Sequence, residues 1–308
     1  MSLGPATTPV TPGAVAVLAN PSAGRGRHGG LLPAVRELLT ATGRPVCLLS
    51  AATAADAVAV CRRAVAAGAS ALVTVGGDGT VHAALQALAT TGVPLGPVPA
   101  GTGNDFALAT GFPADPTAAA AAIADAIRAD RTQGVDLARV GVAGAPDRWY
   151  GAVLAAGFDA IVNERANRMR WPSGPRRYDL AILVELARLR PRRYRIVLDG
   201  EPHHLDAVLV AVGNCASYGG GMRICPAADP ADGLLDVVVA GPVGRATLIR
   251  IKPQVYRGTH VGHPLVRSFR ARQITIEAAG VVGYADGERL GPLPLTVTAV
   301  PDALRLLR

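Results

Sequence analysis

The chain has 308 residues, half of them apolar, and carries 31 Lys and Arg against 23 Asp and Glu, for a net charge of +8 at pH 7. This length indicates two domains, and the apolar fraction excludes a disordered chain. No uncharged apolar run reaches the roughly 18 residues of a membrane-spanning helix, and the first residues lack the basic start and apolar core of a signal peptide. We therefore expect a cytoplasmic protein. The four cysteines form no CxxC pair, which favours buried thiols over disulfides or a metal site: Cys47, Cys61, Cys215 and Cys225.

The first 130 residues alternate short apolar runs with helical periodicity. We expect strands at 14–20, 45–50, 70–75 and 93–99, with helices between them and an Ala-rich helix at 117–129. Strands separated by helices predict an open parallel sheet, whose ligands gather at the carboxyl ends of the strands. The first part of the chain is therefore predicted to be an α/β domain.

After residue 131 the pattern changes to alternating apolar and polar residues with frequent Gly and Pro. Strands are expected at 194–200, 204–214, 234–241 and 272–280, and helices at 159–169 and 178–189. This pattern predicts an antiparallel sheet or β-sandwich as a second domain.

Three glycine-rich loops follow strands of the first domain. They read NPSAGRGRHGG (20–30), GGDGT (76–80) and PAGTGNDFA (99–107). Glycines let backbone N–H groups turn toward an anion, and a helix that starts just beyond adds its positive end. One such loop can be simple turn chemistry, but three at one sheet edge indicate a polyphosphate site. GRGRHG matches GxGxxG, yet no acid follows the second strand to hold a ribose, and a Walker A loop needs a lysine that only Lys252 offers.

Acidic residues accompany these loops. Asp78 and Asp105 lie in two of them, and Asp136 follows at the domain boundary. Magnesium bound to a nucleotide takes carboxylates directly or through water, so these three residues are candidate acids of a metal network. The alternative for Asp105 is a helix N-cap ahead of Phe106.

The order of the motifs resembles the diacylglycerol kinase catalytic domain family, which includes bacterial lipid kinases and sphingosine kinases. NPxxG precedes GGDGT, PxGTxNDFA follows it, and the resemblance continues through VDLA (135–138), DPADGLLDVVV (229–239) and YADGE (284–288). It implies an α/β nucleotide-binding domain at 1–130, joined to a β-sandwich lipid-acceptor domain at 131–295, with 296–308 returning to the first domain. It also implies a kinase that uses ATP and Mg²⁺ to phosphorylate a lipid hydroxyl, with diacylglycerol as the leading acceptor and a sphingoid base or another lipid as alternatives.

The same resemblance assigns roles to individual residues. Asp286 of the DGE motif would be the catalytic base, with Glu288 and Asp78 beside it in the catalytic group, although Asp286-Gly287 also fits a type I′ hairpin turn. A structural Mg²⁺ would be held by the Asp232 side chain and by the carbonyls of Asp229 and Leu234, where the alternative is a plain Asx turn. The residues expected to cradle the nucleotide are Asn20, Pro21, Ser22, Ala23, Gly24, Gly76, Gly77, Asp78, Gly79, Thr80, Thr102, Asn104 and Asp105.

Two features leave alternatives open. The family commonly continues GGDGT with Val-Asn-Glu, but here His82 and Ala83 follow Val81, which keeps a non-catalytic nucleotide or lipid sensor in view; we expect His82 to face solvent. An NAD kinase shares GGDGT, but GTGNDFA and the DGE segment favour the lipid kinase.

The expected partner is a lipid substrate at a membrane surface. Segment 164–195 combines many arginines with Trp171, Tyr178 and an apolar helix. This composition predicts peripheral contact with the inner face of a membrane, against the alternative of a solvated helix pair. No nucleic-acid-binding motif occurs, so we expect no nucleic acid partner. The sequence leaves the oligomeric state open, a homodimer included.

Overall fold

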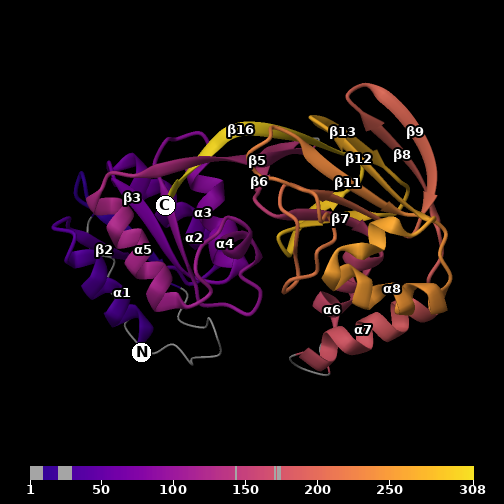
Figure 1. Cartoon of the computed structure of the whole chain (residues 1–308), viewed down its shortest axis with the longest axis horizontal. Coiled ribbons are helices and arrows are strands. Elements are labelled where there is room, and N and C mark those ends of the chain that lie inside the picture. Colours follow the sequence, from indigo (N-terminus) through magenta and orange to yellow (C-terminus); the bar gives the residue numbers. More distant parts are fainter. Residues whose placement is uncertain (1–9, 20–29, 143, 170, 172–174) are drawn as a thin grey trace. The chain divides into compact units, whose positions relative to one another are not determined.

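The computed structural model describes residues 10–19, 30–142, 144–169, 171 and 175–308, and it divides into two compact units (Figure 1). Unit 1 comprises Met1–Leu137 with Val300–Arg308, and unit 2 comprises Ala138–Ala299. The division falls inside two long strands, β5 (Thr132–Val142) and β16 (Leu295–Leu307). The sequence had placed the boundaries near residues 131 and 296, where turn chemistry and the family pattern pointed.

Unit 1 contains a parallel sheet in the order β2-β1-β3-β4, which the end of β16 extends by pairing Leu306 with Leu95. Strands β1, β3 and β4 are buried on both faces, as their continuous apolar runs require, whereas the edge strand β2 alternates buried and partly buried residues. The strands are β1 (Val15–Ala19), β2 (Val46–Leu49), β3 (Ala71–Gly76) and β4 (Leu95–Pro99).

Two pairs of helices accompany this sheet. The helix α2 packs against α3, and α1 packs against α5. Thr53 and Asp56 form a capping box at the start of α2, and Asp115 caps α5. The helices are α1 (Leu31–Thr40), α2 (Ala54–Ala66), α3 (Asp78–Leu88), α4 (Asp105–Ala109) and α5 (Pro116–Arg128).

The strand order places the ligand-binding edge of unit 1. The chain runs from β1 outward to β2, then returns past β1 to β3 and β4. The direction of winding therefore reverses between β1 and β3. Such a reversal leaves a crevice outside the carboxyl ends of the two strands, and the first two glycine-rich loops follow these strands.

Unit 2 is a β-sandwich. Six antiparallel strands in the order β12-β11-β10-β7-β14-β15 form one sheet, and β13, β8 and β9 with the first part of β16 form the other. Residues of both sheets share one core, including Val210 and Val237 from the first and Ile196 and Ile274 from the second. The strands are β6 (Ala145–Tyr150), β7 (Val153–Gly157), β8 (Arg192–Leu198), β9 (Glu201–Ala207), β10 (Leu209–Gly213), β11 (Leu235–Ala240), β12 (Val266–Ala271), β13 (Gln273–Glu277), β14 (Val282–Ala285) and β15 (Glu288–Pro292).

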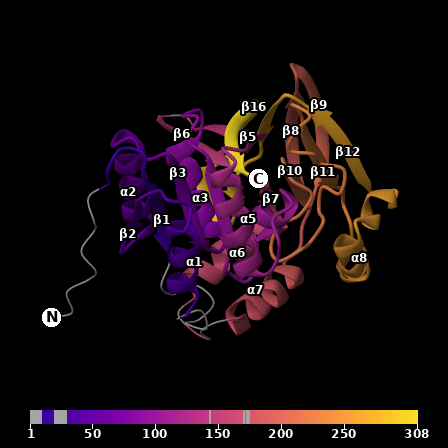
Figure 2. The ribbon, with the colours of Figure 1, turned by 60° about the vertical axis from the view of Figure 1, so that its left-hand side comes forward.

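Three helices and a short 3-10 turn belong to unit 2. They are α6 (Phe158–Arg168), α7 (Pro175–Ala187), α8 (Arg245–Arg257) and η2 (Thr259–Gly262). The pair α6 and α7 pack together, and α8 lies at the outside of the unit in both views (Figures 1 and 2). Within the described residues, no helix is long and apolar enough to cross a membrane.

One predicted strand is wrong in an instructive way. The stretch 204–214 was expected to be a single strand, but the structure divides it into β9 and β10, which belong to different sheets. The chain crosses between sheets at the buried residue Val208. The alternation of the sequence could not reveal this because period two continues whether or not a strand changes partners. The four cysteines are buried and form no disulfide with one another.

Candidate active site

In unit 1 the site is built from loops that follow adjacent parallel strands. The loop after β1 holds Asn20, Pro21, Ser22, Ala23 and Gly24, which lie outside the described residues. The loops after β3 and β4 contact each other closely: a Cβ on Gly101 would collide with the backbone of Gly77. Glycine at these positions therefore lets the two turns touch.

Asp78 joins the two turns. Its Oδ2 accepts a hydrogen bond from the backbone N–H of Asn104 at 2.8 Å, and its Oδ1 accepts one from the N–H of Phe106 at 3.4 Å. Asn104 has the left-handed backbone conformation (φ 60°), and its side-chain Oδ1 accepts a bond from Gly101 N at 2.8 Å. The carboxylate of one glycine turn thus caps the first N–H groups of α4 in the next.

This arrangement changes the interpretation of Asp105. The N-cap of α4 is Asn104, so the predicted capping role for Asp105 is wrong, and Asp78 supplies the cap from another loop. Asp105 is the first helical residue and is only 4% exposed. Around these acids, Thr80 is buried, Gly76, Gly77 and Asn104 are buried or partly buried, and Gly79 and Thr102 are exposed.

Asp136 has a different neighbour. It lies on β5, is 5% exposed, and its Oδ1 accepts a bond from the N–H of Asp302 at 2.9 Å. Asp302 has a positive φ of 54° where the returning strand β16 bends. This contact anchors the chain's return to unit 1.

Unit 1 offers carboxylates that could hold a nucleotide-bound magnesium ion. Among the residues that the structure describes, no three His, Cys, Asp or Glu side chains gather as a metal site. A nucleotide-bound Mg²⁺ needs only one or two carboxylates, because phosphates and water supply its other ligands. Asp78 and Asp105, hard oxygen donors in contacting turns, fit that requirement.

His82 does not face solvent as expected. It is 7% exposed on α3, and its Nε2 lies 3.4 Å from Nε2 of Gln86, one helical turn away. A polar residue in the first turns of a helix usually points outward, but α3 packs between α2 and the strands β3 and β4, and His82 is buried on it. His82 and Ala83, at the two positions where the family usually has Asn and Glu, are therefore both buried residues.

In unit 2, Asp286 lies in the hairpin turn between β14 and β15. Both Asp286 (φ 50°) and Gly287 (φ 84°) have positive φ, as a type I′ turn requires. The carboxylate accepts two backbone hydrogen bonds, from Gly151 N at 2.9 Å and from Ala152 N at 3.0 Å. These bonds hold the carboxylate in one orientation, while the side chain stays partly exposed. Glu288, at the start of β15, is exposed.

A residue that sequence reasoning missed supports this turn. Asn214 is fully buried, and its side-chain Nδ2 donates to the carbonyl of Gly151 at 2.8 Å. The backbone N–H of Asn214 donates to the carbonyl of Ala152 at 2.9 Å. Asp286 therefore binds the N–H groups of Gly151 and Ala152, while Asn214 binds the carbonyls of the same two residues. The only signal in the sequence was a polar residue at the end of an otherwise apolar strand.

Glu164 fastens the same hairpin to α6. It accepts hydrogen bonds from the hydroxyl of Tyr284 at 2.7 Å, from Arg289 at 3.0 Å and from Arg168 at 2.6 Å. The hydrogen bond from Tyr284, followed by the arginine contacts, lowers the pKa of Glu164. The sequence had grouped Glu164 with the predicted membrane segment, whereas the structure uses it to position the turn that carries Asp286.

A second hairpin has the same construction. Asp199 and Gly200, between β8 and β9, also have positive φ, and the Asp199 carboxylate accepts bonds from Arg272 N at 3.0 Å and Gln273 N at 2.8 Å. An Asp-Gly turn with a carboxylate on two consecutive N–H groups is thus a structural device that this fold uses twice. The geometry of the turn alone does not single out Asp286 as a catalytic residue.

Asp159 is an acid whose pKa is strongly raised by its environment. It lies in the first turn of α6 and accepts a hydrogen bond from the hydroxyl of Tyr218. Burial raises the pKa of Asp159 to about 7, because the charged form loses hydration. Sequence reasoning had not marked this residue.

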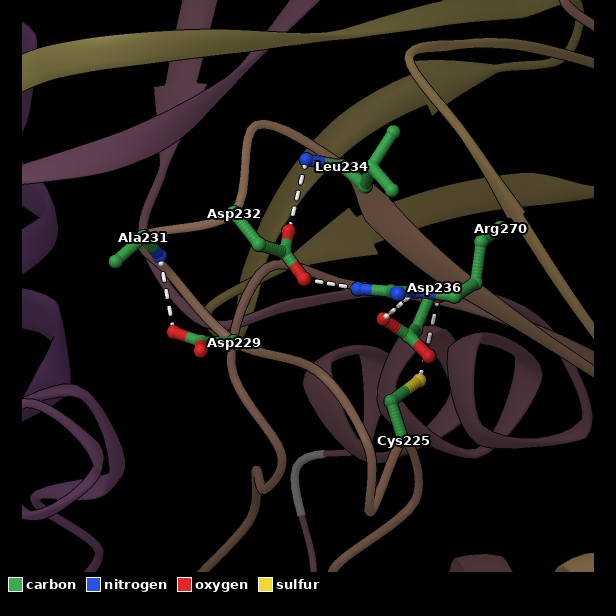
Figure 3. A network of polar contacts seen from close by, with 7 residues as sticks. All are labelled: Cys225, Asp229, Ala231, Asp232, Leu234, Asp236 and Arg270. Atoms are coloured by element: carbon green, nitrogen blue, oxygen red, sulfur yellow. Dashed lines mark hydrogen bonds and ion pairs between the residues drawn. The ribbon is translucent and has the colours of Figure 1, made fainter.

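The DPADGLLD segment forms a network around an arginine (Figure 3). Asp229 accepts a bond from Ala231 N at 3.1 Å and Asp232 accepts one from Leu234 N at 2.9 Å, so the Asx turns offered as the alternative are present. The second oxygen of Asp232 forms an ion pair with Arg270, which also contacts Asp236 at 3.4 Å. A guanidinium already supplies positive charge to this carboxylate, so the arrangement fits a bound cation poorly.

An open groove of about 430 Å³ lies at one end of the sandwich, and none of the predicted site residues lines it. Arg195 and Glu277 form an ion pair of 2.5 Å beside it. Its lining consists of Arg193, Tyr194, Arg195, His204, Glu277, Ala278, Ala279, Leu293 and Pro294.

Comparisons with known proteins agree with both halves of the chain. The family described as "Diacylglycerol kinase catalytic domain" matches residues 14–140, and the one described as "YegS C-terminal NAD kinase beta sandwich-like domain" matches residues 152–308. A protein of Mycobacterium tuberculosis named "Diacylglycerol kinase" is 44% identical over 96% of this chain and 95% of its own length. A "Probable lipid kinase YegS-like" of Pseudomonas fluorescens is 31% identical over 82% of each chain.

A solved structure shares the fold. The "putative diacylglycerol kinase from Bacillus anthracis str. Sterne" superimposes with a TM-score of 0.78 at 22% identity, covering 99% of this chain and 98% of that one. The 44% identity to the Mycobacterium tuberculosis protein, the matches of both family models and the motifs at the strand ends show that the chain belongs to the diacylglycerol kinase family of lipid kinases.

Proposed function

We propose that this protein transfers the γ-phosphate of ATP to the hydroxyl of diacylglycerol and forms phosphatidic acid. Phosphate binding is inferred from one observation: Asp78 of the GGDGT turn binds the backbone of the GTGND turn. Both turns lie at the edge where parallel α/β sheets bind ligands. The choice of diacylglycerol as acceptor is supported by relatives named diacylglycerol kinase that match nearly the whole chain.

The nucleotide would lie on the N-terminal ends of α3 and α4. The N–H groups and dipoles of helix N-termini attract phosphate oxygens, and the lack of side chains at Gly77 and Gly101 would let the phosphates approach the backbone. Asp78 keeps the two turns in register, so its carboxylate acts on the phosphates partly by positioning backbone donors. The loop with Asn20 and Gly24 would complete this cradle.

Asp286 is the proposed base. As the acceptor oxygen forms its bond to the γ-phosphorus, its proton passes to the Asp286 carboxylate and the bond to the bridging oxygen of ADP breaks, with the electron pair leaving on ADP. Phosphoryl transfer relies mainly on positioning and on charge stabilisation. The hydrogen bonds from Gly151 and Ala152 supply the positioning for the carboxylate, and Glu288 of the same motif lies beside it in sequence.

Magnesium belongs to this proposal as the ion that accompanies ATP. When bound, it neutralises phosphate charge and supports the departure of ADP. Asp78 and Asp105 are the residues that would hold it, directly or through water, and Asp136 acts on the fold through Asp302. No step is assigned to an ion at Asp229, Asp232 and Leu234, because Arg270 pairs with the carboxylate there.

The experiment that tests the function is transfer of label from ATP to lipid. The purified protein is incubated with γ-labelled ATP and a mixed lipid extract, and the mass of the labelled product identifies the acceptor. A product with the mass of phosphatidic acid supports diacylglycerol, and a sphingoid phosphate would move the proposal to the alternative acceptor. Absence of labelled lipid across a range of extracts, with ATP still bound, would favour the sensor that the His82-Ala83 departure keeps in view.

A further inference from the structure

Helix α8 presents an outward face with a composition that sequence analysis had not noticed. Ile249 and Tyr256 are 58% and 47% exposed, and Pro253 between them is exposed as well. The positions i, i+4 and i+7 lie on one side of a helix, so these three residues form one apolar stripe. The opposite face, with the buried residue Ile251, packs against the rest of unit 2.

Cations flank this stripe on both sides. Arg245 and Lys252 lie along one side of it and Arg250 and Arg257 along the other, and all four are exposed. Arg245 also donates a hydrogen bond to the carbonyl of Ala187 at the end of α7, so the cations that the test removes are the other three. The helix contains no Asp or Glu, and within the part of the chain that the structure describes none of the four cations forms an ion pair. An apolar stripe between rows of uncompensated cations matches the interface of an anionic bilayer, where apolar residues enter and cations contact headgroups.

The segment first predicted to dock differs from α8 in that it contains carboxylates, namely Glu164, Asp179 and Glu185. Arg165 of α6 pairs with Glu185 of α7, and Arg168 pairs with Glu164 at 2.6 Å. Arginines that already have carboxylate partners inside the unit have less net charge to offer to a membrane. The exposed residues Trp171 and Leu183 remain apolar candidates in that region, and Arg176, Arg188 and Arg190 are exposed there as well, so a variant of that segment belongs to the test.

We infer that the outward face of α8, defined by Arg245, Ile249, Arg250, Lys252, Pro253, Tyr256 and Arg257, docks on anionic phospholipid bilayers. The inference rests on the proposed function only in that a kinase of a membrane lipid must reach its acceptor. Charge complementarity selects the occupant: a neutral bilayer or a basic partner would leave four cations without counter-charge. A second copy of this chain would bring the same cations together, which disfavours self-association through α8.

Flotation of the full-length protein with lipid vesicles tests the docking surface without any use of catalysis. We expect binding to vesicles of phosphatidylcholine with phosphatidylglycerol and little binding to phosphatidylcholine alone, with the difference lost at high salt. The triple variant R250Q/K252Q/R257Q should bind roughly 100-fold more weakly, because each cation near an anionic surface contributes about a fivefold gain in partitioning. The double variant I249S/Y256S should also bind more weakly, with its loss persisting at high salt.

Matched variants separate docking from general changes in charge or surface. The triple R36Q/R62Q/R63Q removes three exposed arginines of unit 1, and L108S/L265S removes two leucines of comparable exposure; both should bind as the unaltered chain does. W171S/L183S tests the segment 164–195 directly. Equal losses in R36Q/R62Q/R63Q, or full binding by both α8 variants, would overturn the inference, as would a loss confined to W171S/L183S.

Two further measurements distinguish bilayer docking from self-association and from catalysis. Sedimentation of the protein without vesicles shows whether it forms a dimer. If it does, if I249S/Y256S makes the dimer dissociate, and if the unaltered chain does not bind vesicles, then the α8 face contacts a second copy and the inference is wrong. Phosphorylation of a short-chain, dispersed diacylglycerol should be unchanged in the α8 variants. If no acceptor is phosphorylated while vesicle binding still depends on α8, the proposed function fails and the docking surface stands.

Discussion

The substitution Asp286→Asn separates the two roles that the structure gives to this carboxylate. As the aspartate, it accepts N–H groups from Gly151 at 2.9 Å and Ala152 at 3.0 Å, one on each oxygen. Asparagine has one side-chain oxygen, and its amide nitrogen would face the second N–H as donor against donor. Both N–H groups belong to buried residues, so the one that is left cannot turn to water.

The magnitudes follow from these contacts. Loss of a hydrogen bond to a charged group at a buried N–H costs about 1.5–3 kcal/mol, so we expect the free energy of unfolding to fall by about that amount. Loss of a general base typically lowers kcat by roughly 100- to 10,000-fold. ATP affinity should change little, because Asp286 belongs to unit 2 and the phosphate-binding turns belong to unit 1.

Asp199→Asn is the matched control, since it makes the same substitution in the same kind of turn. There one oxygen, Oδ1, accepts from both Arg272 N and Gln273 N, so asparagine can keep both bonds and loses only the 3.2 Å contact of Oδ2 with Arg272 N. Asp199 is exposed, so its stability loss should be smaller, and turnover should stay near that of the unaltered chain. Urea unfolding, ATP titration and transfer of label to diacylglycerol measure the three quantities. Full turnover by Asp286→Asn would refute the catalytic role, and an equal loss of turnover in Asp199→Asn would show that the effect is structural.

Three other predictions concern single contacts. Asp78→Ala removes the acceptor of Asn104 N and Phe106 N, so the free energy of unfolding should fall by about 1–3 kcal/mol and ATP should bind more weakly; unchanged ATP affinity would argue against the clamp. For Asp159, a folded pKa of about 7 against an ordinary 3.8 means that the folded state holds a proton that the unfolded state has released. Stability should therefore fall as pH rises from about 4 to about 7, and pH-dependent melting of Asp159→Asn should lack this decline; an identical pH profile would contradict the assigned pKa. Arg270→Gln leaves Asp232 without its counter-charge, so the melting temperature without nucleotide should fall, and Mg²⁺ should restore part of that loss. If Mg²⁺ instead raises the melting temperature of the unaltered chain but not of the variant, the Asp229–Leu234 site binds magnesium after all.

Local sequence patterns were sufficient for most of the architecture. Buried parallel strands need continuous apolar runs, and half-exposed antiparallel strands need alternation, so the change of pattern after residue 131 reported a change of fold. The Asp-Gly pair at 286 and 287 was likewise legible, because a type I′ turn requires positive φ at two consecutive positions. The requirements of strands and tight turns concern residues that are adjacent in the chain, so they can be read from the local sequence.

Contacts between distant residues left no comparable mark. Asp78 meets N–H groups of residues 104 and 106, and Asn214 meets Gly151, because separate strand ends converge on one edge or turn. Almost every residue has a backbone N–H, so the identity of the donor residue does not indicate that it will bind a distant side chain. The burial of His82 has the same origin, because α3 packs against elements from other parts of the chain and the residues next to His82 in the sequence do not indicate this.

The sequence by itself determined that glycine turns follow the strands of a parallel sheet, that a sandwich follows, and that the motifs belong to one kinase family. Only the tertiary structure decided which acid clamps which turn, where one alternating stretch becomes two strands in two sheets, and which helix keeps its cations unpaired. The physical reason is that composition and periodicity record what each residue needs from its own backbone and from water. Partners that are far apart in the chain are chosen only when the sheets and helices pack.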